Sequence, residues 1–196
     1  MAQFLIFKVS ANGQPRKWNL PASDTFNWPR MIHLAWETYD DKQKLLTRED
    51  HIIKPRGFEL SSQVEQRSGV TNEMASKGDD LVEVLELFRA AVQSAEIVFA
   101  HNLNFNESVI GAECIRLAIP NMLIPAEKYC LMQESTYFCR LKGRGGKFKW
   151  PSLTELFQIL FKSKYEGPGN ATNDLLASSA CLFRLINLRQ LDDIFE

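Results

Sequence analysis

The sequence has no long apolar run, and none of its hydrophobic stretches approaches the ~20 consecutive residues that a helix needs to cross a bilayer. The N-terminus also lacks the basic start and the small-residue cleavage site of a secretory signal peptide. These two absences argue against a membrane-spanning or secreted protein, and we expect a cytoplasmic one.

Cysteine is scarce and scattered. The four cysteines form no CxxC pair, which disfavours both a zinc site and a disulfide scaffold; they are Cys114, Cys130, Cys139 and Cys181. We expect reduced thiols.

An excess of charge of either sign is missing as well, because 23 Lys and Arg residues stand against 24 Asp and Glu residues. The whole molecule therefore has no general attraction to nucleic acid or to an anionic membrane. Any binding of nucleic acid has to come from a local patch.

One such patch is the stretch RLKGRGGKFK, which carries five cations in a glycine-containing loop: Arg140, Lys142, Arg144, Lys147 and Lys149. One interpretation is a solvated, mobile surface loop. The other is a nucleic-acid-binding patch that contacts phosphates. Phe148 and Trp150 could then stack on bases, or could instead pin the loop to the core.

The rest of the composition is that of a folded protein, with 45% hydrophobic residues and 13 phenylalanines, and we expect one domain over residues 1–196. Residues 3–10 predict a first, central strand. Residues 31–39 and 45–54 predict a hairpin, and the charges at 48–50 indicate that its second arm lies at the sheet edge.

The later part of the chain alternates between helix and strand. Helices are predicted at 61–67, 79–93, 105–117, 153–161 and 171–188, and strands at 97–100 and 128–132. This alternation is typical of parallel crossovers, so the fold class is α/β.

The stretch from His101 to Glu113 follows a short buried strand and leads into a helix. Such a corner favours chemistry, because two rigid elements hold the backbone there. A purely structural interpretation is favoured for this stretch taken alone, with Asn102 or Asn104 as the helix N-cap and His101 hydrogen-bonded in the core.

Seven segments, taken in order, resemble the DEDDh 3′–5′ exonucleases, the family of the DNA polymerase III epsilon proofreading subunit and ribonuclease T. They are WPRMIHLAWETYD, HIIKPRGF, SGVT, HNLNFNESVIGAE, CLM, KFKWPSLTELFQILF and GNATNDLLASSACLF. The resemblance implies a ribonuclease H-like fold, a mixed five-stranded sheet with helices on both faces. It also implies two-metal phosphodiester hydrolysis by four acids and a histidine, in which His101 has a structural role.

Most of the implied catalytic positions are substituted. Lys8 and Ser10 stand where the family has Asp-x-Glu, Asn106 where it has the third acid, and Gly169 where it has the histidine; Asp174 alone is retained. Two metal ions beside an ammonium and a single carboxylate are electrostatically untenable. We therefore predict no metal or other cofactor, and an ion pair between Lys8 and Asp174.

Three functions remain open. The first is an inactive exonuclease-fold protein that keeps a nucleic-acid or protein partner. The second is an active exonuclease on DNA or RNA with an altered site, in which Asp174 and either Glu107 or Glu113 hold one Mg²⁺ or Mn²⁺. The third is a protein-interaction module without nucleic acid. Oligomeric state and the identity of any partner do not follow from the sequence.

Overall fold

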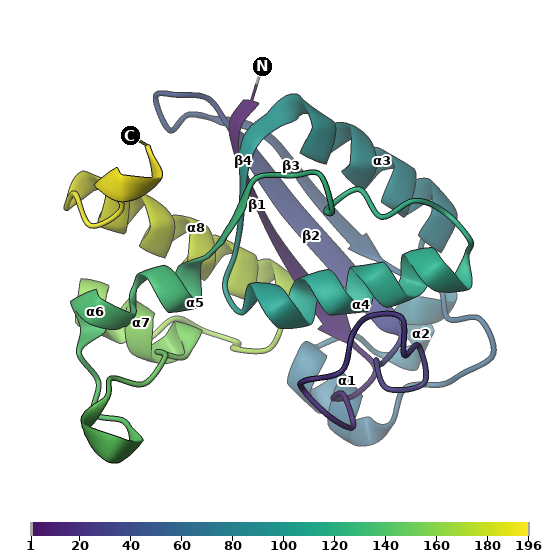
Figure 1. Ribbon diagram of the computed structural model, residues 1–196. Helices are drawn as coiled ribbons and strands as arrows, with labels where there is room; N and C mark the ends of the chain where they lie inside the picture. The colour runs from purple at the N-terminus through teal and green to yellow at the C-terminus, as the bar shows by residue number, and fades with distance from the viewer. Residues whose placement is uncertain (1, 196) are drawn as a thin grey trace.

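A computed structural model describes residues 2–195, and five strands form its centre (Figure 1). The strands are β1 (Ala2–Ala11), β2 (Met31–Tyr39), β3 (Leu45–Ile52), β4 (Ala95–Ala100) and β5 (Lys128–Cys130). They lie in the order β3-β2-β1-β4-β5, with antiparallel pairing from β3 to β1 and parallel pairing from β1 to β5. The central place of β1 and the edge place of β3 are as predicted.

Helices cover both faces of this sheet (Figure 1). The α-helices are α1 (Ser62–Ser68), α2 (Asn72–Ser76), α3 (Leu81–Ser94), α4 (Leu103–Arg116), α5 (Leu131–Glu134), α6 (Thr136–Cys139), α7 (Leu153–Phe161) and α8 (Ala171–Asn187). Two short 3₁₀ turns lie at Arg144–Gly146 and Asp192–Ile194. The predicted fold class, a mixed five-stranded α/β sheet with helices on both faces, is confirmed.

The two-residue period of β1 explains this layering. Leu5, Phe7 and Val9 point into the core beneath α3 and α4, whereas Phe4 and Ile6 join the core beneath α7 and α8. Since β1 is apolar on both faces, it has to be covered on both. The polar residues Lys8 and Ser10 come only where the strand approaches its end.

Element boundaries differ from the prediction at every strand except β2. β1 extends one residue beyond 3–10 at each end and β4 begins two residues before 97, whereas the other two strands end earlier than predicted. The last strand ends at Cys130 and Leu131 already begins α5, so the predicted strand at 128–132 is two residues too long. β3 likewise ends at Ile52 and does not reach Lys54. A short apolar run such as CLM has no period that separates strand from helix, which is the reason for the first error.

The four cysteines are all free thiols, three of them buried. Within residues 2–195, no helix combines the length and the apolar character needed to cross a membrane.

Candidate functional site

The five positions singled out by the sequence converge at the end of β1. Val9 N–H donates to Asn106 Oδ1 at 2.7 Å, which fixes the start of α4 against the strand. Ser10 Oγ donates to the carbonyl of Gly169 at 3.2 Å, and Lys8 contacts Asp174 in the first turn of α8. The strand end and two helix starts therefore bring together residues that are far apart in the chain, such as Ser10 and Gly169, which are 159 positions apart.

The predicted ion pair between Lys8 and Asp174 is confirmed. Lys8 Nζ lies 3.0 Å from Asp174 Oδ2, and the two side chains are 17% and 7% exposed. The other oxygen, Oδ1, accepts hydrogen bonds from Tyr165 Oη at 2.8 Å and from Gly169 N–H at 3.1 Å. Burial and the adjacent Asp174 carboxylate raise the pKa of Tyr165, so its phenol keeps the proton that it donates.

Asn106 uses both ends of its amide. While Oδ1 accepts from Val9, Nδ2 donates to the backbone carbonyls of His101 at 3.0 Å and of Asn102 at 2.8 Å. The side chain is fully buried. A carboxylate at this position would have no hydrogen for those two carbonyls, so the site is built for the amide.

His101 is 5% exposed, and its Nε2 lies 3.1 Å from the carbonyl oxygen of Pro151. Burial and, after it, the charge of Lys8 lower the pKa of His101 to about 4. The ring is therefore neutral at pH 7 and donates to Pro151, which agrees with the structural role expected of it. Asn102 is the N-cap of α4, as one interpretation had it, but in a left-handed conformation and without a side-chain capping bond.

Gly169 has a backbone φ of +100°, and a Cβ built on it would lie 2.7 Å from the carbonyl oxygen of Arg67. A side chain of any kind, histidine included, would collide with the backbone of α1. The sequence pattern did not predict that α1 packs so closely against the start of α8.

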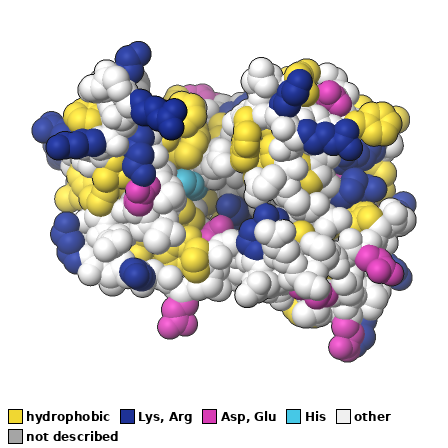
Figure 2. Space-filling view, turned by 90° about the horizontal axis from the view of Figure 1, so that it is seen from below, with side chains coloured by type: hydrophobic (Ala, Val, Ile, Leu, Met, Phe, Trp, Pro, Cys, Tyr) yellow, Lys and Arg dark blue, Asp and Glu magenta, His cyan; other side chains and the backbone are white. Residues whose placement is uncertain are grey.

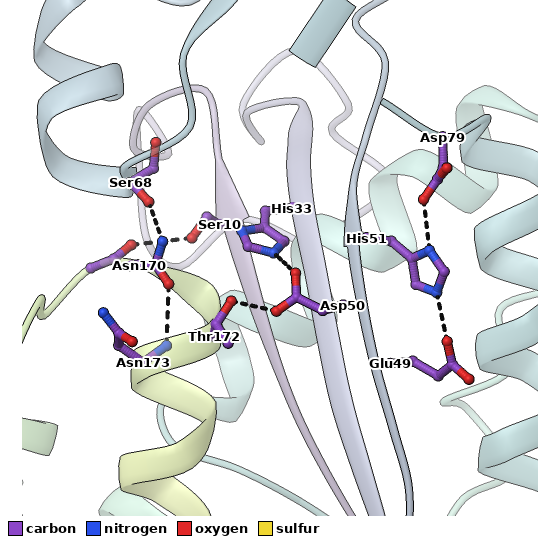
Figure 3. Close-up of polar contacts among 11 residues, drawn as sticks. Ser10, His33, Glu49, Asp50, His51, Ser68, Asp79, Asn170, Thr172 and Asn173 are labelled. Carbon is purple, nitrogen blue, oxygen red and sulfur yellow. Dashed lines mark hydrogen bonds and ion pairs between the residues drawn. The ribbon is translucent and has the colours of Figure 1, made fainter. Parts of the chain in front are cut away.

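The start of α8 is further held by a polar network that sequence reasoning missed (Figure 3). His33 Nε2 lies 2.6 Å from Asp50 Oδ1, Thr172 donates to the other oxygen of Asp50, and Asn170 donates to the carbonyl of Ser68 at 2.8 Å. The hydrogen bond from His33 is the main cause that lowers the pKa of Asp50. The network ties α8 to α1, β2 and β3, and thereby positions Asp174.

These residues do not fit a pair of divalent cations. Such ions need several free carboxylate oxygens, whereas both oxygens of Asp174 are taken by protein donors. Glu107 pairs with Lys128 at 3.1 Å, and Glu113 is enclosed by Arg30 and the N–H of Met31. In the part of the chain that the structure describes, no three His, Cys, Asp or Glu side chains are grouped to hold a metal ion.

A groove lies beside this site and is lined by aromatic side chains. One part, of about 540 Å³, lies among Trp18, Asn102, Met132 and Trp150. The adjoining part, of about 470 Å³, lies among Tyr137, Lys147, Phe148 and again Trp150. Figure 2 shows a hollow between two lobes of this face, with basic and hydrophobic side chains along its walls. Trp18 and Tyr137 come from segments that the sequence patterns did not mark.

The basic loop of residues 140–149 forms one rim of this groove. A bridge between Lys142 and Phe148 closes the loop around its 3₁₀ turn, and Lys149 pairs with Glu155 at the start of α7. Phe148 and Trp150 are 42% and 58% exposed, so neither is held in the core. Both side chains are accessible to solvent beside the cations.

No family model matches the chain, and no curated protein matches it either. Solved structures do. The chain superposes on E. coli exonuclease I in complex with a dT13 oligonucleotide at a TM-score of 0.74 and 14% identity, over 100% of this chain and 43% of that one. It superposes on exonuclease X in complex with 5′ overhanging duplex DNA at a TM-score of 0.63 and 17% identity, over 95% of this chain and 92% of that one. It superposes on the nuclease domain of 3′hExo, a DEDDh family member bound to rAMP, at a TM-score of 0.68 and 12% identity, over 93% of this chain and 92% of that one.

The chain thus spans less than half of exonuclease I but nearly the full length of the other two matched chains. At such low sequence identity, the superpositions establish the fold alone. The chemistry of the site has to be inferred from the residues that this chain carries there. The fold of this chain is that of the DEDDh 3′–5′ exonucleases.

Proposed function

We propose that this chain is a catalytically inactive exonuclease-fold domain that binds single-stranded nucleic acid without cleaving it. The observation that carries the proposal is the Lys8 ammonium, 3.0 Å from the one acid retained at the site. A fixed positive charge there takes the place that a hydrolytic metal ion would need. The neutral His101 is bonded to Pro151, and Gly169 has no side chain, so neither provides a general base.

Nucleic-acid binding is supported by the groove. Exposed aromatic faces at Trp18, Phe148 and Trp150 offer stacking platforms for bases, which single-strand-binding surfaces use together with cations that follow the backbone. Lys142 and Lys147 are exposed on its rim. The similar structures of exonuclease I and exonuclease X were solved with an oligonucleotide and with DNA. The shared fold supports the proposal that this chain also binds nucleic acid.

The first experiment incubates the purified chain with labelled single-stranded DNA and RNA in Mg²⁺ or Mn²⁺. We expect no shortening of either strand. Degradation that disappears in Asp174→Ala would contradict the inactive assignment and leave the altered-site exonuclease as the function.

The second experiment measures binding to a fluorescent oligonucleotide at two salt concentrations. We expect Trp150→Ala to weaken binding about tenfold, because stacking on one base is worth roughly 1–3 kcal/mol. Phe26→Ala is the matched control, since Phe26 is 86% exposed and lies outside the groove lining.

Charge is tested with Lys142→Glu/Lys147→Glu, which we expect to weaken binding and to flatten its dependence on salt by about one unit of slope per lost phosphate contact. Lys42→Glu/Lys44→Glu makes the same charge change in the turn between β2 and β3 and is expected to matter less. Absence of binding at low salt would overturn the proposal in favour of a protein-interaction module.

A further inference from the structure

A small cavity of about 120 Å³ opens beside the Lys8–Asp174 pair, and two cations border it. Lys8 and Arg67 line it together with Ser10, Gln14 and Asp174, so two positive charges face one negative charge. We propose that this cavity is an anion site, which binds the terminal phosphate of a nucleic-acid strand. The position at which the exonuclease chemistry needs a cation site has thus become a site for the opposite charge.

Lys8 is held in place but is not saturated. Its ammonium has three N–H donors, and Asp174 Oδ2 is its ion-pair partner at 3.0 Å. Asp174 is in turn fixed by Tyr165 and by the N–H of Gly169. Two donors of the ammonium thus remain for a ligand, and the ion pair keeps Lys8 in one orientation before the ligand arrives, which reduces the entropic cost of binding.

Arg67 supplies the second cation from the last turn of α1. One of its terminal nitrogens donates to the carbonyl of Ala11 at 3.1 Å, which brings the guanidinium to the end of β1. A guanidinium has five N–H donors in a planar fork that matches phosphate oxygens. Arg67 lines the cavity together with Lys8, and only one hydrogen bond of its guanidinium, to Ala11, is made within the described residues.

The size and the charge of the cavity favour a phosphate at a strand end. Its volume lies well below the roughly 300–1,000 Å³ of pockets that enclose a drug-sized ligand, so a small group fits and a nucleoside does not. A terminal phosphate monoester carries about −1.5 to −2 charges at pH 7, more than an internal diester. The identity of this ligand rests on the proposed function, since binding in the neighbouring groove would deliver a strand end to the cavity.

The test compares three short oligothymidylates that end in a 3′-phosphate, a 5′-phosphate or hydroxyls only. We expect one of the two phosphorylated strands to bind about tenfold more tightly than the hydroxyl-ended strand, because its terminal phosphate adds charge-assisted hydrogen bonds to Lys8 and Arg67. Lys8→Met/Asp174→Asn, which removes both charges of the pair, and Arg67→Gln are each expected to abolish this difference. The matched control is Lys77→Met/Glu73→Gln, which removes the exposed ion pair of α2 and should keep the difference.

Two results would overturn the anion site: equal affinity for all three strands, or a phosphate preference that persists in Lys8→Met/Asp174→Asn. Both are separable from a failure of the proposed function. If Trp150→Ala weakens all three strands equally and no preference exists, strand binding stands and the anion site fails. If the hydroxyl-ended strand does not bind but inorganic phosphate binds in a Lys8-dependent manner, the anion site stands and the proposed function fails.

Discussion

Two buried carboxylates of this protein, Glu113 and Asp174, differ in whether a cavity adjoins them. Glu113 on α4 is fully buried and accepts from Arg30 Nε at 2.8 Å and from the N–H of Met31 at 2.9 Å, with Arg116 3.0 Å away. Asp174 on α8 is also buried, but its cationic partner is Lys8 and the pair borders a cavity. The first is sealed by protein donors on every side, and the second is open on one side.

The difference shows what separates a structural ion pair from one that can bind a ligand. Arg30 and Arg116 hold Glu113 in a fully buried position and tie α4 to the start of β2, so a further partner cannot reach its carboxylate. A lysine offers one compact charge with three donors and uses only part of them on Asp174. Both carboxylates are buried, so burial does not distinguish them. The pair at Asp174 can bind a ligand because Lys8 has unused N–H donors and a cavity adjoins it.

The largest expected effect comes from breaking the sealed pair. Glu113→Gln leaves Arg30 and Arg116 without a counter-charge, and we expect the free energy of unfolding to fall by about 3–5 kcal/mol. Urea denaturation followed by circular dichroism measures it. Glu73→Gln, which breaks an exposed pair with Lys77, is the control and should cost less than about 1 kcal/mol. Similar losses for the two variants would remove the distinction between sealed and open pairs.

The next effect concerns pH. His101 has a folded pKa of about 4 against an ordinary value of 6.5, so between these values the unfolded chain binds more protons than the folded chain. Stability is therefore complete above pH 6.5 and falls as the pH drops towards 4, by about 3 kcal/mol.

His101→Gln can still donate to Pro151 and should remove most of this pH dependence. Denaturation curves at pH 7, 5.5 and 4, compared between the two proteins, test it. In Lys8→Met the pKa of His101, followed by NMR, should rise because a nearby positive charge is gone. An unchanged value would show that Lys8 does not act on the ring.

A smaller loss is expected at the amide beside the pair. Asn106→Asp removes the two donors that serve the carbonyls of His101 and Asn102 and places a carboxylate against them, so we expect a loss of about 2 kcal/mol. Asn104→Asp, on the same helix start but exposed, is the matched control. A neutral effect at Asn106 would mean that the site tolerates an acid after all.

The smallest loss is expected for the open pair itself. Lys8→Met leaves Asp174 with its hydrogen bonds from Tyr165 and Gly169 and with access to cavity water, so we expect about 1 kcal/mol. Lys8→Met/Asp174→Asn should recover most of that loss. A loss as large as that of Glu113→Gln would show that Lys8 is mainly structural.

The sequence alone predicted the order of the five strands and the five longer helices along the chain, the central place of β1 and the meeting of Lys8 with Asp174. It could do so because the period of apolar residues is local, and because the resemblance aligned distant positions. It did not predict that Trp18 and Tyr137 line the groove with Trp150, since Trp18 lies in an irregular segment and Tyr137 in a helix of four residues, too short to show a periodic pattern. Nor did it assign Glu113 to Arg30, 83 residues away in the chain.

What the sequence determined by itself was therefore the architecture and the residue types present at the end of β1. The hydrophobic period sets the layers, and residue type limits the chemistry that is available. Only the tertiary structure determined what stands in place of that chemistry. The approach of Arg67 to Gly169 and the cavity between Arg67 and Lys8 depend on how α1, β1 and α8 pack. Packing of this kind follows from contacts between distant residues, which no local pattern records.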